Sequence, residues 1–271
     1  MVSYLPVSLN EALEYRGAGG AIPYGGGTDL MIKGDKDAAY IFLHKVPEMR
    51  GIIEDDKYIR IGACCTFTEV AGNPLCPAIL REAALQIAAP AIRNLGTIGG
   101  NIGNGSPKAD SAPVFFAAGA KLRLMSLRAE RIIPIKEFYL GRNKLSLEPD
   151  ELIVEVLMPK HVSSRYYYRK VGAREALAIS RVSFAGLMDI KEGRVMHCAV
   201  SFGAVSDVII RRDDIDAMLT GKTVSEAKAV KQAYLNAYNT AITPIRGRVS
   251  EKYRKAVCMN LLGDFLAAMG I

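Results

Sequence analysis

The chain has 271 residues, half of them hydrophobic, and a formal net charge of +7. This length is sufficient for one large or two ordinary domains, and 23% charged residues without a run of one sign exclude a disordered or low-complexity chain. Because the sequence contains no long uninterrupted apolar stretch and no basic start followed by an apolar run, we expect no transmembrane segment and a cytoplasmic protein.

The cysteines indicate a reducing compartment. Their number, five, is odd, and a chain of this size does not need disulfides for stability. No pair has the CxxC spacing, so we predict neither a zinc site nor an iron-sulfur cluster in this chain. The cysteines are Cys64, Cys65, Cys76, Cys198 and Cys258.

The positive net charge favours anionic ligands or an acidic partner surface. Lysines and arginines are nevertheless scattered along the chain, without the basic stripe and interleaved aromatic residues that are typical of a nucleic-acid groove. We therefore predict no nucleic-acid binding.

The amino-terminal 56 residues predict a small α/β unit. Ser8 and Glu11 have the spacing of a capping box that begins a helix, and Gly17 with the glycines after it ends this helix. Short strands separated by glycine- and aspartate-rich turns are expected at residues 21–24, 39–42 and 52–54.

The rest of the chain mixes strands and helices. Strands are expected at residues 58–61, 121–125, 131–135, 151–158, 166–170, 184–190 and 195–202. Helices are expected at residues 77–87, 113–118, 225–238 and 251–269. The composition changes near residues 160–165, which marks a domain boundary. Because strands and long helices do not alternate regularly, the pattern favours an α+β architecture over a doubly wound parallel sheet.

A first glycine loop runs over residues 25–30, after a predicted strand. Gly25, Gly26 and Gly27 let the backbone approach a ligand closely and turn its N–H groups toward a pyrophosphate, and Thr28 adds a hydroxyl donor. A tight structural loop stabilised by the Thr28–Asp29 pair explains the same residues equally well. The spacing matches neither a Walker loop nor a Rossmann fingerprint.

A second glycine-rich stretch fills residues 96–105. Its five glycines and interposed polar residues form a small-residue surface against which a large cofactor can lie. Asp110 follows, just before the predicted helix at residues 113–118. It can cap that helix or accept hydrogen bonds from sugar or ribityl hydroxyls.

These motifs together resemble the FAD-binding medium subunit of the molybdenum hydroxylases, the xanthine dehydrogenase and carbon monoxide dehydrogenase family. The resemblance rests on ordered motifs along nearly the whole chain. They are Gly26 to Leu30, Ile61 to Ala63 with Thr66 and Glu69, Thr97 to Asn101, Pro149 to Ile153, Tyr168 to Lys170, Ser201 to Val205, Leu219 to Lys222, Ile245 to Gly247 with Ser250, and Tyr253-Arg254.

The resemblance implies a fold of the vanillyl-alcohol oxidase type. Two α+β subdomains, at about residues 1–56 and 57–163, would form the FAD-binding domain. Residues 164–271 would form a carboxy-terminal domain of an antiparallel sheet with helices, similar to the carbon monoxide dehydrogenase flavoprotein.

The resemblance also implies the cofactor-binding residues. The two glycine loops would hold the pyrophosphate of FAD through main-chain N–H groups, Asp110 would bind the ribityl or nearby polar groups, Ile153 would pack on the isoalloxazine ring, and Lys170 would place a cation near the flavin. The loop residues are Tyr24, Gly25, Gly26, Gly27, Thr28, Asp29 and Leu30 in the first loop and Thr97, Ile98, Gly99, Gly100 and Asn101 in the second. Departures from the family pattern occur at Ile87, at residues 175–178 and at Thr243-Pro244.

The implied function is electron transfer within a hetero-oligomeric oxidoreductase. Non-covalent FAD would accept electrons from the [2Fe-2S] clusters of a small partner subunit, while a large partner subunit carries molybdopterin, and would pass them to NAD⁺ or another acceptor. No catalytic side chain and no metal ligand is expected in this chain. The alternatives are a stand-alone FAD-dependent reductase of the same fold and a non-redox assembly or binding module.

Overall fold

The computed structural model describes residues 2–35, 37–163 and 165–271. It consists of two compact units, Met1–Gly105 with Gly119–Lys160 and Ser106–Ala118 with His161–Ile271. The units do not follow the chain order strictly, because the segment Ser106–Ala118 joins the second unit. The domain boundary at residue 163 stays a prediction.

The first unit begins with helix α1 (Leu9–Gly17) and two parallel strands, β1 (Ala21–Tyr24) and β2 (Ala39–Phe42). The short helix α2 (Leu30–Lys33) lies between these strands in the chain, and two 3₁₀ turns, Leu43–Lys45 and Pro47–Met49, follow them.

The amino-terminal cap of α1 differs from the predicted capping box. Ser8 accepts a hydrogen bond from the Glu11 N–H as predicted, but the Glu11 carboxylate accepts from the main-chain N–H of Val7 at 2.8 Å and from the Tyr15 hydroxyl at 2.9 Å. Glu11 therefore binds one residue ahead of the cap, and only half of the predicted box forms.

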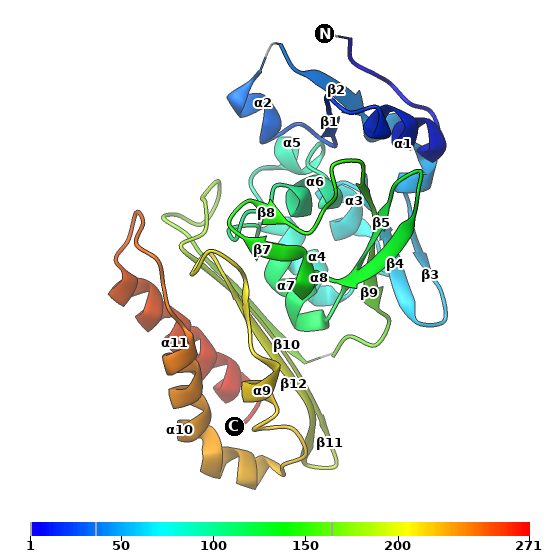
Figure 1. Ribbon diagram of the computed structural model, residues 1–271. Helices are drawn as coiled ribbons and strands as arrows, with labels where there is room; N and C mark the ends of the chain where they lie inside the picture. The colour runs from blue at the N-terminus through cyan, green and yellow to red at the C-terminus, as the bar shows by residue number, and fades with distance from the viewer. Residues whose placement is uncertain (1, 36, 164) are drawn as a thin grey trace. The chain divides into compact units, whose positions relative to one another are not determined.

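A five-stranded antiparallel sheet forms the centre of the first unit (Figure 1). Its order is β3 (Ile52–Glu54), β4 (Tyr58–Gly62), β9 (Leu152–Pro159), β5 (Lys121–Met125) and β6 (Glu130–Pro134). The middle strand β9 is almost entirely buried, as its apolar sequence dictates. The remaining elements are α3 (Phe67–Gly72), α4 (Ala78–Leu85), α5 (Pro90–Arg93), α6 (Ile98–Gly103), α8 (Ile135–Phe138), β7 (Tyr139–Gly141) and β8 (Lys144–Leu145).

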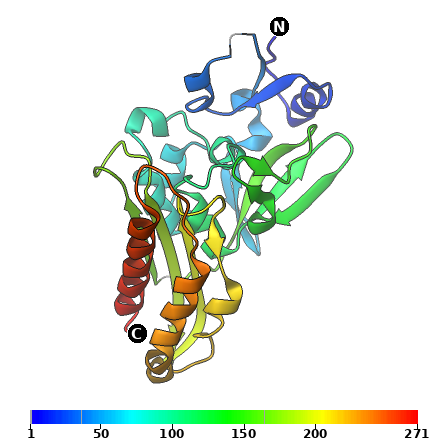
Figure 2. The same cartoon turned by 60° about the vertical axis from the view of Figure 1, so that its left-hand side comes forward.

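The second unit is an antiparallel sheet covered by helices on both faces. The sheet order is β10 (Tyr166–Val171), β11 (Val182–Lys191), β12 (Arg194–Gly203) and β13 (Ile210–Arg211). The helices are α7 (Ala112–Ala118), α9 (Asp213–Asp216), α10 (Val224–Ala241) and α11 (Glu251–Ala268). Figures 1 and 2 show α10 and α11 side by side along one face of this sheet.

Alternation along the strands assigns the two faces of this sheet. Phe184 and Phe202 point to the face covered by α10 and α11, where Phe184 lies 5.7 Å from Phe265 and Phe202 lies 5.6 Å from Tyr238 between ring centroids. Ser201 points to the opposite face and donates to the main-chain carbonyl of Pro113 in α7 at 2.6 Å. Residues of one strand therefore contribute to two separate cores.

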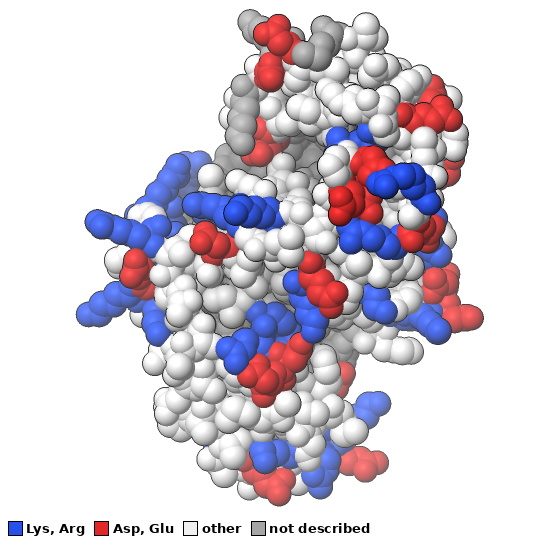
Figure 3. Space-filling view, viewed as in Figure 1, with Lys and Arg blue, Asp and Glu red and all other residues white. Residues whose placement is uncertain are grey.

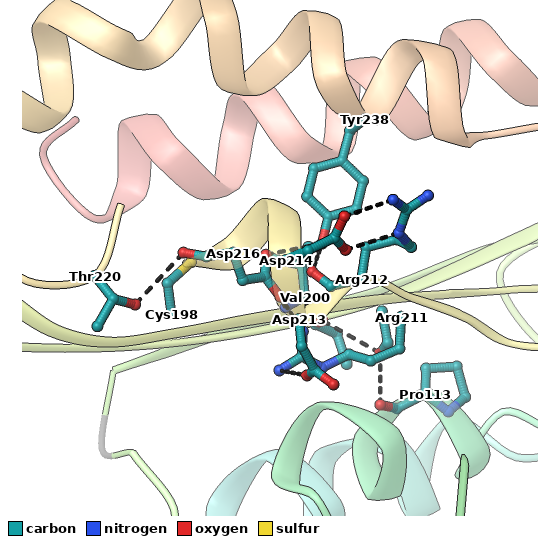
Figure 4. Close-up of polar contacts among 12 residues, drawn as sticks. Pro113, Cys198, Val200, Arg211, Arg212, Asp213, Asp214, Asp216, Thr220 and Tyr238 are labelled. Atoms are coloured by element: carbon teal, nitrogen blue, oxygen red, sulfur yellow. Dashed lines mark hydrogen bonds and ion pairs between the residues drawn. The ribbon is translucent and has the colours of Figure 1, made fainter. Parts of the chain in front are cut away.

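A buried carboxylate links β12, β13, α9 and α10 (Figure 4). Asp216 is 2% exposed, and its Oδ1 accepts from the hydroxyls of Tyr234 at 2.7 Å and Tyr238 at 2.8 Å. Its Oδ2 accepts from the main-chain N–H of Val200 at 3.1 Å and from the guanidinium of Arg211. Burial raises the pKa of Asp216 to about 6, and the Arg211 charge opposes this shift.

Charges of both signs are interspersed on the face of the molecule shown in Figure 3.

Among the described residues, no helix has the length and hydropathy required to span a membrane.

We predict that Asp216→Asn lowers the free energy of unfolding by about 3–5 kcal/mol, because it removes the buried carboxylate that pairs with Arg211 and leaves this guanidinium with the exposed Asp213, 3.0 Å away. Asp214→Asn is the control, since the Asp214–Arg212 pair at 2.6 Å is exposed and we expect no measurable loss. Urea unfolding followed by far-UV circular dichroism measures both. Equal midpoints for the two variants would contradict the assignment.

Candidate functional site: the glycine loops and the Asp110 cluster

The first glycine loop packs tightly because it lacks side chains. A Cβ at Gly26 would lie 1.7 Å from the main-chain carbonyl oxygen of Leu95, so no other residue fits there. Gly27 has a φ of +68°, and a Cβ on it would lie 1.9 Å from the Tyr24 hydroxyl. Gly25 approaches the second glycine stretch, since its Cβ would lie 2.5 Å from Thr97 Oγ1. The structure therefore brings the two glycine loops together within the first unit.

Residues 25–28 are half-buried, and each has a main-chain N–H group. Within the described part of the chain, no atom accepts a hydrogen bond from any of these four groups. Main-chain donors that are partly withdrawn from water require an acceptor, and successive N–H groups in a loop provide a concave surface for the oxygens of an anion. The first loop therefore fits a pyrophosphate.

Residues 98–103 of the second glycine stretch form a short helix, α6, where we expected a loop. Thr97 caps it by accepting from the Gly100 N–H at 3.1 Å. The N–H groups of residues 98–101 all have acceptors within the unit. These acceptors are the carbonyl oxygens of Cys65 and Ala63, Thr97 Oγ1 and the carbonyl oxygen of Thr97, at 2.9, 2.8, 3.1 and 3.0 Å.

These four N–H groups already have acceptors within the protein. The geometry therefore does not support the implied role of residues 98–101 as N–H donors to a pyrophosphate. Gly99 is buried, and a Cβ on it would lie 2.6 Å from the Ala63 Cβ. Gly100 is exposed, and a Cβ on it would meet only Thr97 Oγ1, at 2.9 Å. Gly99 serves the packing of α6, whereas Gly100 is exposed next to the first loop, where its Cα would lie 3.7 Å from a Cβ on Gly25.

Ile153, from the buried strand β9, lies beside α6 in the same unit. It is 7% exposed, and a Cβ at Gly103 would lie 3.6 Å from its Cδ1. Ile87, at a departure from the family pattern, is 9% exposed.

Asp110 and Lys170 belong to the second unit, where they form a buried ion pair. Lys170 Nζ lies 2.7 Å from Asp110 Oδ2, and the two side chains are 5% and 10% exposed. Ser180 donates to the other carboxylate oxygen of Asp110. The Tyr168 hydroxyl donates to the Asp110 main-chain carbonyl at 3.2 Å.

Two expectations for this pair change. Helix α7 begins at Ala112, whose N–H donates to the Ala109 carbonyl, and the N–H groups of Val114 and Phe115 donate to the Ser111 carbonyl. The Asp110 carboxylate instead binds Lys170 and Ser180. The Lys170 cation is compensated by a carboxylate at contact distance, so its field is that of a pair and not of an isolated charge. Burial raises the pKa of Asp110, and the Lys170 charge and the Ser180 hydrogen bond oppose that shift.

Sequence reasoning missed Ser180. It is 1% exposed, and nothing in its local pattern distinguishes it from other serines near a strand end. Its partner lies 70 residues away in the chain, and only the folded hairpin brings the two side chains together.

The cysteines are buried thiols in both units. Burial raises the pKa of Cys64, Cys76 and Cys258 to about 12 and that of Cys65 to about 11. Such thiols are inert, because the thiolate is the form that binds metals and reacts. No group of three or more histidine, cysteine or acidic residues in the described ranges is arranged to hold a metal ion.

Comparison with known families defines the class of protein. Residues 1–161 match the family described as the FAD binding domain in molybdopterin dehydrogenase, and residues 166–269 match the CO dehydrogenase flavoprotein C-terminal domain. The chain therefore belongs to the FAD-binding flavoprotein family of the molybdopterin dehydrogenases.

Individual relatives agree with this family. The chain is 36% identical over 199 residues to a putative xanthine dehydrogenase FAD-binding subunit of Escherichia coli K12, covering 69% of this chain and 67% of the relative. It is 28% identical to the nicotinate dehydrogenase FAD-subunit of Eubacterium barkeri over 93% of this chain and 90% of the relative. A solved carbon monoxide dehydrogenase of Hydrogenophaga pseudoflava superposes with a TM-score of 0.90 at 28% identity, covering 98% of this chain and 96% of that one.

These findings confirm the predicted class and fold. The chain is a flavoprotein component of an oxidoreductase, with FAD as the cofactor of its family and an α+β fold that ends in an antiparallel sheet with helices.

We predict that Gly26→Ala lowers the free energy of unfolding of the cofactor-free protein by about 1–3 kcal/mol, because its Cβ would overlap the Leu95 carbonyl oxygen and force the two loops apart. Gly72→Ala is the matched control, since a Cβ at this helical glycine meets nothing within 4 Å. Thermal unfolding of both variants measures the difference. A Gly26→Ala protein as stable as Gly72→Ala would contradict the loop packing.

Proposed function

We propose that this chain is the electron-transfer subunit of a molybdenum hydroxylase complex. It takes electrons from the [2Fe-2S] clusters of a partner subunit and delivers them to NAD⁺ or another soluble acceptor, while substrate is oxidised on a molybdopterin-binding partner. The observation that carries the proposal is the row of N–H groups at residues 25–28, which lacks internal acceptors in a chain of this flavoprotein family.

The first unit provides the contacts for the phosphate half of FAD. The N–H groups of residues 25–28 donate to pyrophosphate oxygens, and the Thr28 hydroxyl adds a further donor. Asp29 and Leu30 connect the loop to α2. Gly100 has no side chain and so leaves space for the cofactor. Thr97 and Asn101 contribute polar side chains at the α6 end of this surface, and Ile153 offers an aliphatic contact for the flavin ring.

In this proposal, Asp110 and Lys170 also serve FAD binding. Asp110 accepts hydrogen bonds from hydroxyl groups of the cofactor, and Lys170 holds that carboxylate in place with its ammonium group. FAD, when bound, supplies the redox chemistry that amino-acid side chains lack. The protein residues bind and orient it and shield it from water, so no general base or catalytic nucleophile is required.

The iron-sulfur clusters belong to a partner in this proposal. The five thiols of this chain are buried, and burial raises their pKa values, which favours a structural role for them. Neither glycine loop contains a histidine or cysteine that could attach the flavin covalently, so FAD binds non-covalently.

We predict that Gly100→Val abolishes FAD retention, because a branched side chain at this exposed glycine fills the space next to the first loop. The visible flavin absorption of the purified protein measures FAD content, and circular dichroism verifies folding. Gly72→Val, on another exposed glycine whose Cβ would meet nothing within 4 Å, is the control and should retain FAD. A folded Gly100→Val protein with a normal flavin spectrum would refute the placement of the second loop at the cofactor.

Purification of the tagged chain from its native host tests the partner assignment. We expect two further chains in stoichiometric amounts, one with molybdopterin and one with iron and acid-labile sulfide. A homogeneous yellow protein that stays a single chain and turns over a substrate by itself would instead support a stand-alone reductase.

A further inference from the structure

A buried serine stands at the base of the segment that joins β10 to β11. Ser180 is 1% exposed and is the last residue of the stretch 172–180. The next residue, Arg181, donates its N–H to the Val171 carbonyl at 2.7 Å and closes this stretch. The position of Ser180 is therefore set by the pairing of the two strands.

The Asp110 carboxylate is held at both oxygens by this hairpin. Lys170, from β10, lies at Oδ2, and Ser180, next to β11, donates to Oδ1. Two donors on opposite oxygens fix the plane of a carboxylate, and each oxygen keeps a lone pair for another donor. Lys170 alone would leave the carboxyl group free to rotate about its terminal bond.

We propose that Ser180 is a positioning residue of the FAD site, which orients the Asp110 carboxylate toward the cofactor hydroxyls and keeps it ready to accept hydrogen bonds. This inference rests on the proposed FAD function of Asp110. Ser180 acts through Asp110 and needs no contact with FAD itself.

The same hydrogen bond influences the charge of Asp110. The groups that face this carboxylate are the Lys170 ammonium, the Ser180 hydroxyl and, at the main chain, the Tyr168 hydroxyl. Burial raises the pKa of Asp110, and donation from Ser180 favours the ionised form. Loss of the Ser180 hydroxyl therefore raises the pKa of Asp110 further, and a protonated carboxyl has fewer acceptor sites for FAD hydroxyls.

Ser183, which lies three residues further along the chain in β11, provides a matched control. It is fully buried like Ser180, but its hydroxyl has no hydrogen-bond partner in the described part of the chain. Replacing either serine by alanine removes one oxygen from a buried position, and only the change at Ser180 removes a hydrogen bond to a carboxylate.

The experiment titrates the cofactor-free full chain with FAD and follows the quenching of flavin fluorescence between pH 5 and 8. Wild type, Ser180→Ala, Ser180→Cys, Ser183→Ala and Asp110→Ala are compared, and thermal unfolding verifies that each is folded. We expect Ser180→Ala to weaken FAD binding about tenfold at pH 7. As the pH is lowered, we also expect Ser180→Ala to lose FAD binding at a higher pH than the wild-type protein does. Ser183→Ala should bind FAD as the wild-type protein does.

Ser180→Cys keeps nearly the same volume with a weak donor, and we expect an affinity between those of wild type and Ser180→Ala. If Ser180→Ala does not fold, Ser180→Cys is compared with the wild-type protein and with Ser183→Ala in its place. Wild-type affinity and pH dependence in the Ser180 variants would overturn the inference, and so would an equal loss in Ser180→Ala and Ser183→Ala. If Asp110→Ala binds FAD as wild type does, the role proposed for Asp110 itself fails, and the inference fails with it.

Discussion

The close approach of two backbones, at Gly26 and at the Leu95 carbonyl, is the contact on which the proposed cofactor site depends. No side chain separates the two segments, so the first loop can lie flat against the residues that lead into α6. Residues 25–28 are half-buried beside this contact, and their N–H groups have no acceptors among the described residues. A loop free to move would turn these donors toward water, and the protein would lose its preorganised surface for an anion.

Buried carboxylates play two different roles in the second unit. Asp216 has its lone pairs occupied by two tyrosine hydroxyls, a main-chain N–H and a guanidinium, so it ties strands to helices and offers nothing to a ligand. Among the described residues, Asp110 has one side-chain donor on each oxygen, which leaves acceptor capacity. The number of donors around each carboxylate, and not its burial, distinguishes Asp216 from Asp110, the group that we propose to bind FAD hydroxyls.

The strands and long helices follow from the sequence because local patterns determine them. The predicted strands 21–24, 39–42, 52–54 and 121–125 coincide with β1, β2, β3 and β5. Short runs of apolar and β-branched residues between turn residues favour a strand over other local structures. Helix α6 was missed because three of its six residues are glycine, which has low helix propensity, and the Thr97 cap with tertiary contacts overrides this preference. The family resemblance supplied Asp110 and Lys170, but their pairing and the role of Ser180 depend on contacts across 58 to 70 residues that no local pattern encodes.

The course of the chain between the two units restricts how this protein could be divided or recombined. Segment Ser106–Ala118 leaves the first unit, contributes α7 to the second and returns, so the chain passes between the units three times. A cut at a single peptide bond near residue 160 would remove α7 from the sheet whose Ser201 donates to its Pro113 carbonyl, and would expose an apolar face. Exchange of one unit alone between relatives would therefore need three coordinated crossovers, one at each passage between the units, and the two units are expected to be inherited together.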